Sequence, residues 1–114
     1  MRKLALKDAF SLARIVKAAD VKKEMVSFAA EMRGKKAEDI EAVGLEFFVT
    51  LIQAASDVNV ENKVYALYAD LKGATAEEVS NYDLATVKAD IKELIAENDL
   101  KSFFSSFSAL MSKQ

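Results

Sequence analysis

Two clusters of carboxylates are the side chains in this sequence best suited to acid–base chemistry or metal binding. Glu38, Asp39 and Glu41 form one cluster, and Glu77 and Glu78 form the other. Neighbouring carboxylates can act as a general acid and base, or can ligate a hard cation such as Ca²⁺. Both clusters fall where helices are expected to begin, and there the helix dipole favours acidic residues without any catalytic role. We therefore interpret both clusters as helix starts.

The residues needed for most other catalytic chemistry are missing. The sequence has no histidine and no cysteine, which excludes disulfides, thiolate or imidazole catalysis and the usual zinc ligands. Residues 57–61 match the start of a calcium-binding loop, but Asn62 replaces its required glycine and Tyr68 its final glutamate. No glycine-rich phosphate-binding loop is present. We therefore expect no enzyme activity, no catalytic residue, no metal site and no cofactor.

Composition indicates one helical domain. The chain has 114 residues, of which 52% are hydrophobic and 30% are charged. This is enough apolar material for a core, but too little chain for two domains. Proline is absent and there are 3 glycines, although sheets and tight turns rely on both residues. We expect a single all-α domain that spans residues 1–114.

Apolar residues recur at helical spacing along almost the whole sequence. This pattern predicts a compact orthogonal bundle of six to seven short helices. The longest helix spans about 37–55 and is apolar on nearly every side after Glu46, which predicts a buried central helix. Gly44 in this helix should allow a neighbouring helix to pack closely.

Individual residues predict where the helices begin and end. Thr75 and Glu78 have the spacing of a capping box. Gly34 and Gly73 are expected to end the helices that precede them. The candidate N-caps are Asp8, Asp20, Asn59 and Asp83.

Charge is divided unevenly along the chain. Residues 1–36 carry a net charge of +6, whereas residues 37–99 carry a net charge of −10. Such a division can hold two halves of one domain together, or it can drive head-to-tail association of identical subunits. For the second interpretation the candidate self-association residues are Arg14, Lys17, Lys22 and Lys23.

The last predicted helix carries a dense apolar stripe, with Ser102, Ser105, Ser106 and Ser108 on the opposite side. One interpretation is that the stripe closes the domain's own core. The other is that it binds an amphipathic helix of a partner, through aromatic and methionine anchors. The candidate partner-binding residues are Phe103, Phe104, Phe107, Leu110 and Met111.

Nucleic acid and membranes are two further classes of partner. The basic residues near positions 18–20 suit a helix-turn-helix, but the turn glycine is missing and the pI is 5.2. We do not expect nucleic acid as the partner, although a small helical DNA-binding regulator is the alternative function. The apolar stretch 4–6 ends too early for a signal peptide, and the most hydrophobic run, 47–52, is too short to span a membrane. We therefore expect a cytoplasmic protein without a membrane partner.

Three segments of the sequence resemble a known protein family. They are residues 4–19 (LALKDAFSLARIVKAA), 44–48 (GLEFF) and 99–104 (DLKSFF). Their apolar pattern resembles that of the small tail assembly chaperones of long-tailed phages and prophages of Gram-positive bacteria. The shared pattern contains no residue-level functional motif.

The resemblance implies a small α-helical protein that binds the tape measure protein of the phage tail and keeps it soluble. It also implies recruitment of the tail tube protein, action in the host cytoplasm and absence from the mature virion. Chaperones of this family commonly have a longer form made by ribosomal frameshifting. The division of charge also allows a homo-oligomer. A helical protein-interaction subunit of unrelated role fits the same sequence features.

Overall fold

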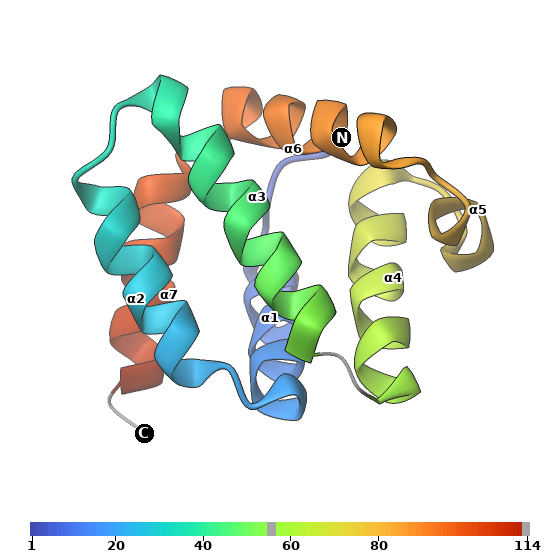
Figure 1. Cartoon of the computed structure of the whole chain (residues 1–114), viewed down its shortest axis with the longest axis horizontal. Coiled ribbons are helices and arrows are strands. Elements are labelled where there is room, and N and C mark those ends of the chain that lie inside the picture. The colour runs from blue at the N-terminus through green and yellow to red at the C-terminus, as the bar shows by residue number, and fades with distance from the viewer. Residues whose placement is uncertain (55–56, 113–114) are drawn as a thin grey trace.

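The computed structural model describes residues 1–54 and 57–112, and within these ranges it contains helices and no strand (Figure 1). The prediction of an all-α bundle is therefore confirmed, and its seven helices match the predicted number. The helices are α1 (Leu6–Ala19), α2 (Lys22–Arg33), α3 (Ala37–Ala54), α4 (Val58–Lys72), α5 (Ala76–Ser80), α6 (Leu84–Glu97) and α7 (Leu100–Ser112).

The helices are arranged around a central pair. Figure 1 shows α1 and α3 in the middle, α2 and α7 on one side, α4 and α5 on the other, and α6 across one end. The helix pairs with the most extensive contacts are α2 with α7, α1 with α4, and α4 with α5, and α3 packs to a lesser and equal extent against α2 and α6. The Cα radius of gyration is 13.2 Å, which is close to the value of about 13 Å expected for a compact domain of this size.

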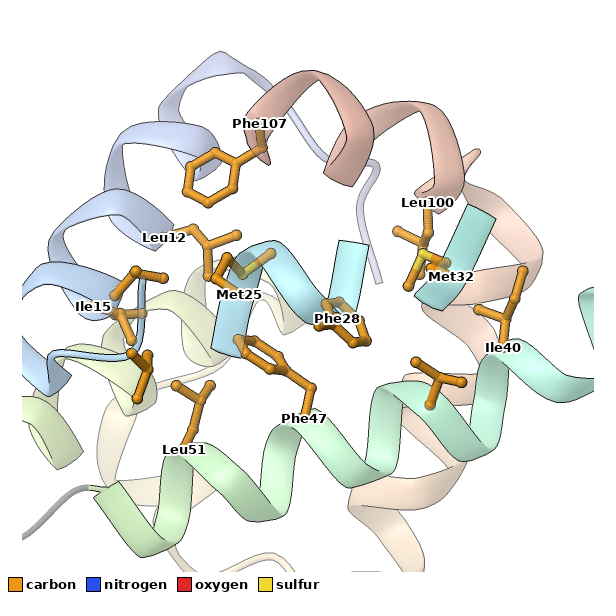
Figure 2. Packing of buried hydrophobic residues seen from close by; sticks show 13 residues of the cluster. Leu12, Ile15, Met25, Phe28, Met32, Ile40, Phe47, Leu51, Leu100 and Phe107 are labelled. Atoms are coloured by element: carbon orange, nitrogen blue, oxygen red, sulfur yellow. The ribbon is translucent and has the colours of Figure 1, made fainter. Parts of the chain in front are cut away.

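The main core lies between α1, α2, α3 and α7 (Figure 2). Ile15, Met25 and Met32 are almost completely buried there. The Phe28 ring stacks on Phe47, with 4.5 Å between ring centroids, and meets the edge of Phe104 at 5.1 Å. These contacts join α2 to both α3 and α7, so the aromatic residues of the last helix help to close the core.

The long helix α3 is central, as predicted, but it is buried on one side. Its core-facing side chains are Ile40, Val43, Phe47 and Leu51. The expectation that apolar residues would be covered all round is wrong, because Val49 and Ile52 are exposed. A Cβ atom added at Gly44 would lie 3.6 Å from Ile91 Cγ2, so α6 does pack closely at this glycine.

Several predicted helix ends are confirmed. The Thr75 hydroxyl accepts a hydrogen bond from the Glu78 amide, and the Glu78 carboxylate accepts one from the Thr75 amide, both at 3.1 Å. Asp83 accepts a hydrogen bond from the Thr86 amide at 2.7 Å. Gly73 ends α4 in the left-handed conformation, with φ of 74°, and Gly34 ends α2.

Three of the four predicted N-caps are wrong in detail. Asp8 lies inside the first turn of α1, which begins after Ala5, and Asp57 rather than Asn59 caps α4. Asp20 ends α1 in a left-handed conformation (φ 56°) instead of beginning α2. Aspartate tolerates this conformation better than most residues because its short polar side chain can make local hydrogen bonds.

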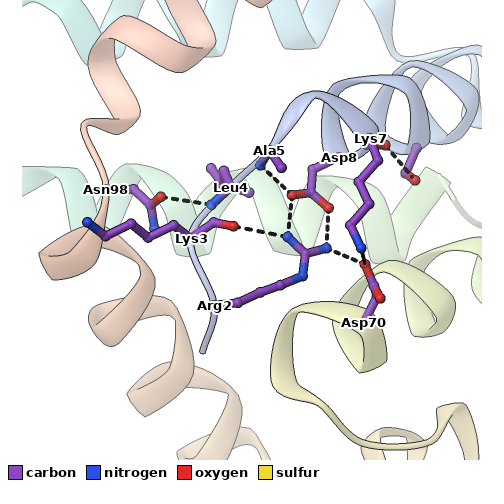
Figure 3. A network of polar contacts seen from close by, with 9 residues as sticks. Arg2, Lys3, Leu4, Ala5, Lys7, Asp8, Asp70 and Asn98 are labelled. Carbon is purple, nitrogen blue, oxygen red and sulfur yellow. Dashed lines mark hydrogen bonds and ion pairs between the residues drawn. The ribbon is translucent and has the colours of Figure 1, made fainter.

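The segment before α1 ties three helices together, and we call it the N-terminal clasp, defined by Arg2, Leu4, Asp8, Asp70 and Asn98 (Figure 3). Both Nη atoms of Arg2 donate to the two Asp8 carboxylate oxygens at 2.7 Å, and Arg2 also pairs with Asp70 of α4. The Leu4 amide donates to Asn98 Oδ1 at 2.9 Å, which links the segment to the end of α6.

Asp8 is the most buried charged group of the N-terminal clasp, with 2% of its surface exposed. Burial alone would raise the pKa of Asp8, but hydrogen bonds from Arg2 and the Ala5 amide lower that pKa below its ordinary value. The same contact with Asp8 raises the pKa of Arg2. Both Asp8 and Arg2 are therefore charged at neutral pH.

Candidate partner-binding site

Three of the five predicted partner-binding residues pack inside the domain. Phe107 is a core residue, and Figure 2 shows its ring beside Leu12 of α1. Phe103 and Phe104 are partly buried and pack against the same core. The two rings meet edge to face at 5.2 Å, and Phe103 stacks on Phe107 at 6.3 Å. The positions of these three phenylalanines agree with the first interpretation of the last helix, in which its apolar stripe closes the domain's own core.

The remaining two residues lie closer to solvent. Leu110 is 63% exposed, and Met111 is partly buried against the edge of the core. The predicted row of outward serines is wrong at one position, because Ser108 is buried. Ser108 follows Phe104 by four residues, so it lies one turn further along the same face of α7.

Leu110 and Met111 form part of a groove of about 550 Å³ between α1 and α7. Leu6 and Phe10 form its other edge and are 75% and 58% exposed. We call this surface the basic groove. The residues that define it are Leu6, Phe10, Arg14, Lys17, Lys22, Phe107, Leu110 and Met111.

The basic groove brings together residues from both sets predicted from the sequence. Arg14, Lys17 and Lys22, predicted for self-association, line the same groove as the end of the last helix. Lys23 is not part of it, and lines a separate hollow between α2 and α3. The two sets could not be joined from the sequence, because α1 and α7 lie at opposite ends of the chain.

Charge in the basic groove is mostly positive. Asp20 is the only carboxylate among the described residues that line it. Arg14 and Lys17 are exposed, and neither has an ion-pair partner within residues 1–54 and 57–112. The groove therefore combines an apolar floor with two exposed cations, Arg14 and Lys17, that form no ion pair among the described residues.

A second hollow, of about 400 Å³, lies between α3, α4 and the α5–α6 region. We call it the tyrosine hollow and define it by Ile52, Glu61, Tyr65, Tyr68, Tyr82 and Leu84. Leu84 is 76% exposed. Sequence reasoning missed this surface, although all three tyrosines of the chain lie in the acidic segment, at positions 65, 68 and 82.

Polar contacts fix two of these tyrosines. Tyr65 donates to Glu61 at 2.5 Å, and Tyr68 donates to the buried Asp90 at 2.5 Å. Burial and the hydrogen bond to Asp90 raise the pKa of Tyr68. Lys72 also donates to Asp90, at 2.6 Å, and this hydrogen bond raises the pKa of Lys72. Tyr68, Lys72 and Asp90 therefore form a hydrogen-bonded cluster that stabilises the wall of the hollow next to α6.

The carboxylate clusters do not form a metal site in the described part of the chain, where no group of three or more ligating side chains comes together. Glu78 completes the capping box of α5. The other described members of the two clusters at helix starts are Asp39, Glu41 and Glu77. The side chain of Glu38 lies outside the described residues. No described helix is both long enough and apolar enough to cross a membrane.

Comparisons with protein-family models, with curated proteins and with solved structures give no match for this chain. The basic groove and the tyrosine hollow are the features of this chain that bear on its function.

Proposed function

We propose that this protein is a tail assembly chaperone of a long-tailed phage or prophage, which binds the tape measure protein and keeps it soluble. The observation that supports this proposal is the basic groove. Leu6, Phe10 and Leu110 leave large apolar side chains exposed around one concavity. Clustered exposed apolar residues on a small protein mark an interaction surface.

The basic groove suits an amphipathic helix. Such a helix binds through apolar anchors that repeat every three or four residues, and it needs an apolar floor between two raised edges. Phe107 and Met111 form that floor, while Phe10 and Leu110 rise at the edges. Methionine adapts to differently shaped partners, which suits a chaperone that must cover many turns of one long helical client.

The positive charge of the groove also favours one kind of client helix over others. Arg14 and Lys17 have no carboxylate partner among the described residues, so a client helix with acidic residues beside its apolar stripe is favoured. From the resemblance we further assign recruitment of the tail tube protein, action in the host cytoplasm and absence from the mature virion. The lack of histidine and cysteine in the sequence supports a role without enzyme activity.

A small DNA-binding regulator is the alternative that one observation favours, namely the unpaired cations on α1. DNA affinity from such cations would fall steeply with salt. It would also survive removal of apolar groups from the groove. A helical interaction subunit of unrelated role would bind a protein other than the tape measure protein.

The proposal is tested by purifying a tagged protein from its host lysogen during phage induction. We expect the tape measure protein to be recovered with the wild type and with Val49→Ala, an exposed apolar position outside the basic groove. We expect its loss with Leu110→Glu. Recovery of DNA that is released by salt would favour the regulator. Recovery of the tape measure protein equally with all three forms would contradict the assignment of the groove.

A further inference from the structure

We infer that copies of this chain associate head to tail, with the exposed edge of α1 from one copy seated in the tyrosine hollow of the next. The occupant of the hollow is therefore a second copy of the same protein. This inference does not depend on the identity of the client, because it concerns two surfaces that every copy carries.

The exposed edge of α1 is a single stripe. Leu6, Phe10, Arg14 and Lys17 follow one another at spacings of four, four and three residues, which places them on one face of the helix. The stripe is apolar in its first half and cationic in its second half. We call it the α1 ridge.

The tyrosine hollow is complementary to the α1 ridge in shape and in chemistry. Its volume of about 400 Å³ lies within the range of about 300–1,000 Å³ typical of ligand pockets, so it can accept the Phe10 ring. Tyr65 and Tyr82 line the hollow, where an aromatic guest can contact them. The Tyr82 ring already meets the Tyr68 ring at 5.7 Å and has Lys72 Nζ 5.9 Å from its centroid, so Tyr65 is the main ring open to the guest. Ile52 and Leu84 add exposed apolar side chains at the mouth.

Charge is complementary as well. Glu61 lines the tyrosine hollow, and none of the described residues that line it is lysine or arginine. Asp83 is exposed beside Leu84 at the start of α6. The α1 ridge brings Arg14 and Lys17, which have no carboxylate partner among the described residues of their own domain. Opposite charge on the two surfaces steers them together and fixes their register.

The two surfaces have no residue in common. Figure 1 shows α1 in the middle of the domain and α4 and α5 at one side. One copy can therefore offer its α1 ridge to one neighbour and its tyrosine hollow to another. Contacts of this heterologous kind build rings or open chains rather than closed symmetric dimers.

Self-association also has a consequence for client binding, and this consequence alone rests on the proposed function. Leu6 and Phe10 belong to both the α1 ridge and the basic groove. A neighbouring copy and a client helix therefore compete for them. Without a client, a second copy covers these apolar side chains, and a client displaces it.

The test is sedimentation velocity on the purified full chain over a wide range of concentrations. We expect the wild type to show association that increases with concentration. Phe10→Ala removes the centre of the α1 ridge, and Leu84→Ala removes an apolar side chain at the mouth of the hollow. Each variant should weaken association about tenfold or more, as loss of a central interface contact does. Val49→Ala, exposed but outside both surfaces, should associate like the wild type, and circular dichroism should show equal helix content in all forms.

Mixing the two variants distinguishes head-to-tail contact from other modes. The Phe10→Ala protein keeps an intact hollow and the Leu84→Ala protein keeps an intact ridge, so one of each should form a dimer that cannot grow. A wild type that stays monomeric at every concentration would overturn the inference. So would variants that associate like the wild type, or a mixture that forms assemblies larger than a dimer. None of these results depends on whether the tape measure protein binds.

Discussion

Arg2 in the N-terminal clasp and Arg14 in the basic groove belong to the same positively charged segment, but their surroundings differ. Arg2 makes two hydrogen bonds to the buried Asp8 and a further pair with Asp70. Arg14 is exposed and has no carboxylate partner among the described residues. The first interpretation of the divided charge therefore describes Arg2, which joins helices within the domain. Arg14 makes no such contact among the described residues, as the second interpretation requires.

The same contrast divides α7. Phe107 is 5% exposed and packs in the core, whereas Leu110, three residues later, is largely exposed. A stripe that looks uniform in the sequence thus contains both buried and solvent-exposed residues. Substitutions at the two kinds of position should separate stability from partner binding.

The largest effect is expected for Phe107→Ala, which should lower the free energy of unfolding by about 3–5 kcal/mol, the usual cost of emptying a buried phenylalanine site. Urea denaturation monitored by circular dichroism measures this change. Leu110→Ala is the matched variant on the same helix and should change stability by less than about 0.5 kcal/mol. Equal losses for the two variants would show that the division of α7 is wrong.

Asp8→Ala should lower the free energy of unfolding by a smaller amount, about 2–4 kcal/mol, because it leaves the Arg2 guanidinium without its buried partner. Asp70→Ala removes an exposed partner of the same arginine and should cost clearly less. The comparison is made by chemical denaturation of both variants. A loss at Asp70 as large as that at Asp8 would mean that burial does not determine the strength of the N-terminal clasp.

The N-terminal clasp should also make stability depend on pH. The pKa of Asp8 is lower in the folded protein than its ordinary value of 3.8. The stabilisation from its charged form is therefore complete above the unfolded pKa and is lost as pH falls through the folded pKa. Unfolding measured from neutral pH down to acid should show this decline, and Asp8→Asn should reduce it. An unchanged decline in that variant would assign the acid sensitivity to other carboxylates.

The smallest effect on stability is expected for the double variant Arg14→Glu and Lys17→Glu, which should stay within about 0.5 kcal/mol of the wild type. Its effect should appear in association instead, because it reverses the charge of the basic groove and of the α1 ridge. Lys35→Glu with Lys36→Glu makes the same change in net charge elsewhere and serves as the control. A loss of stability in the first variant, with association unchanged, would show that Arg14 and Lys17 stabilise the fold, as Arg2 does, and do not take part in association.

The helices and many of their ends could be predicted from the sequence because their causes are local. Apolar spacing determines a helix, and the contacts between Thr75 and Glu78 or between Asp83 and Thr86 span three residues. Asp8 could not be assigned in this way. Its side chain is held by Arg2 in the preceding segment, and Arg2 in turn depends on Asp70 in α4.

The candidate site was predictable only in pieces. The sequence predicts Arg14 for self-association and Leu110 for partner binding, but nothing in it indicates that residues of α1 and α7 line one groove. The tyrosine hollow is lined by residues of four separate helices, and nothing in the local sequence of α6 shows that Leu84 is exposed while Val87 is buried. Surfaces built from distant segments require the tertiary structure.

The most direct test of the central claim is the solubility of the tape measure protein when it is co-expressed with this chain. We predict that the wild type and Val49→Ala keep the client in the soluble fraction. Leu110→Glu and the double variant Arg14→Glu with Lys17→Glu should fail to do so, while their own helix content and stability stay unchanged. A client that is equally soluble with all four forms, or insoluble with the wild type, would contradict the account.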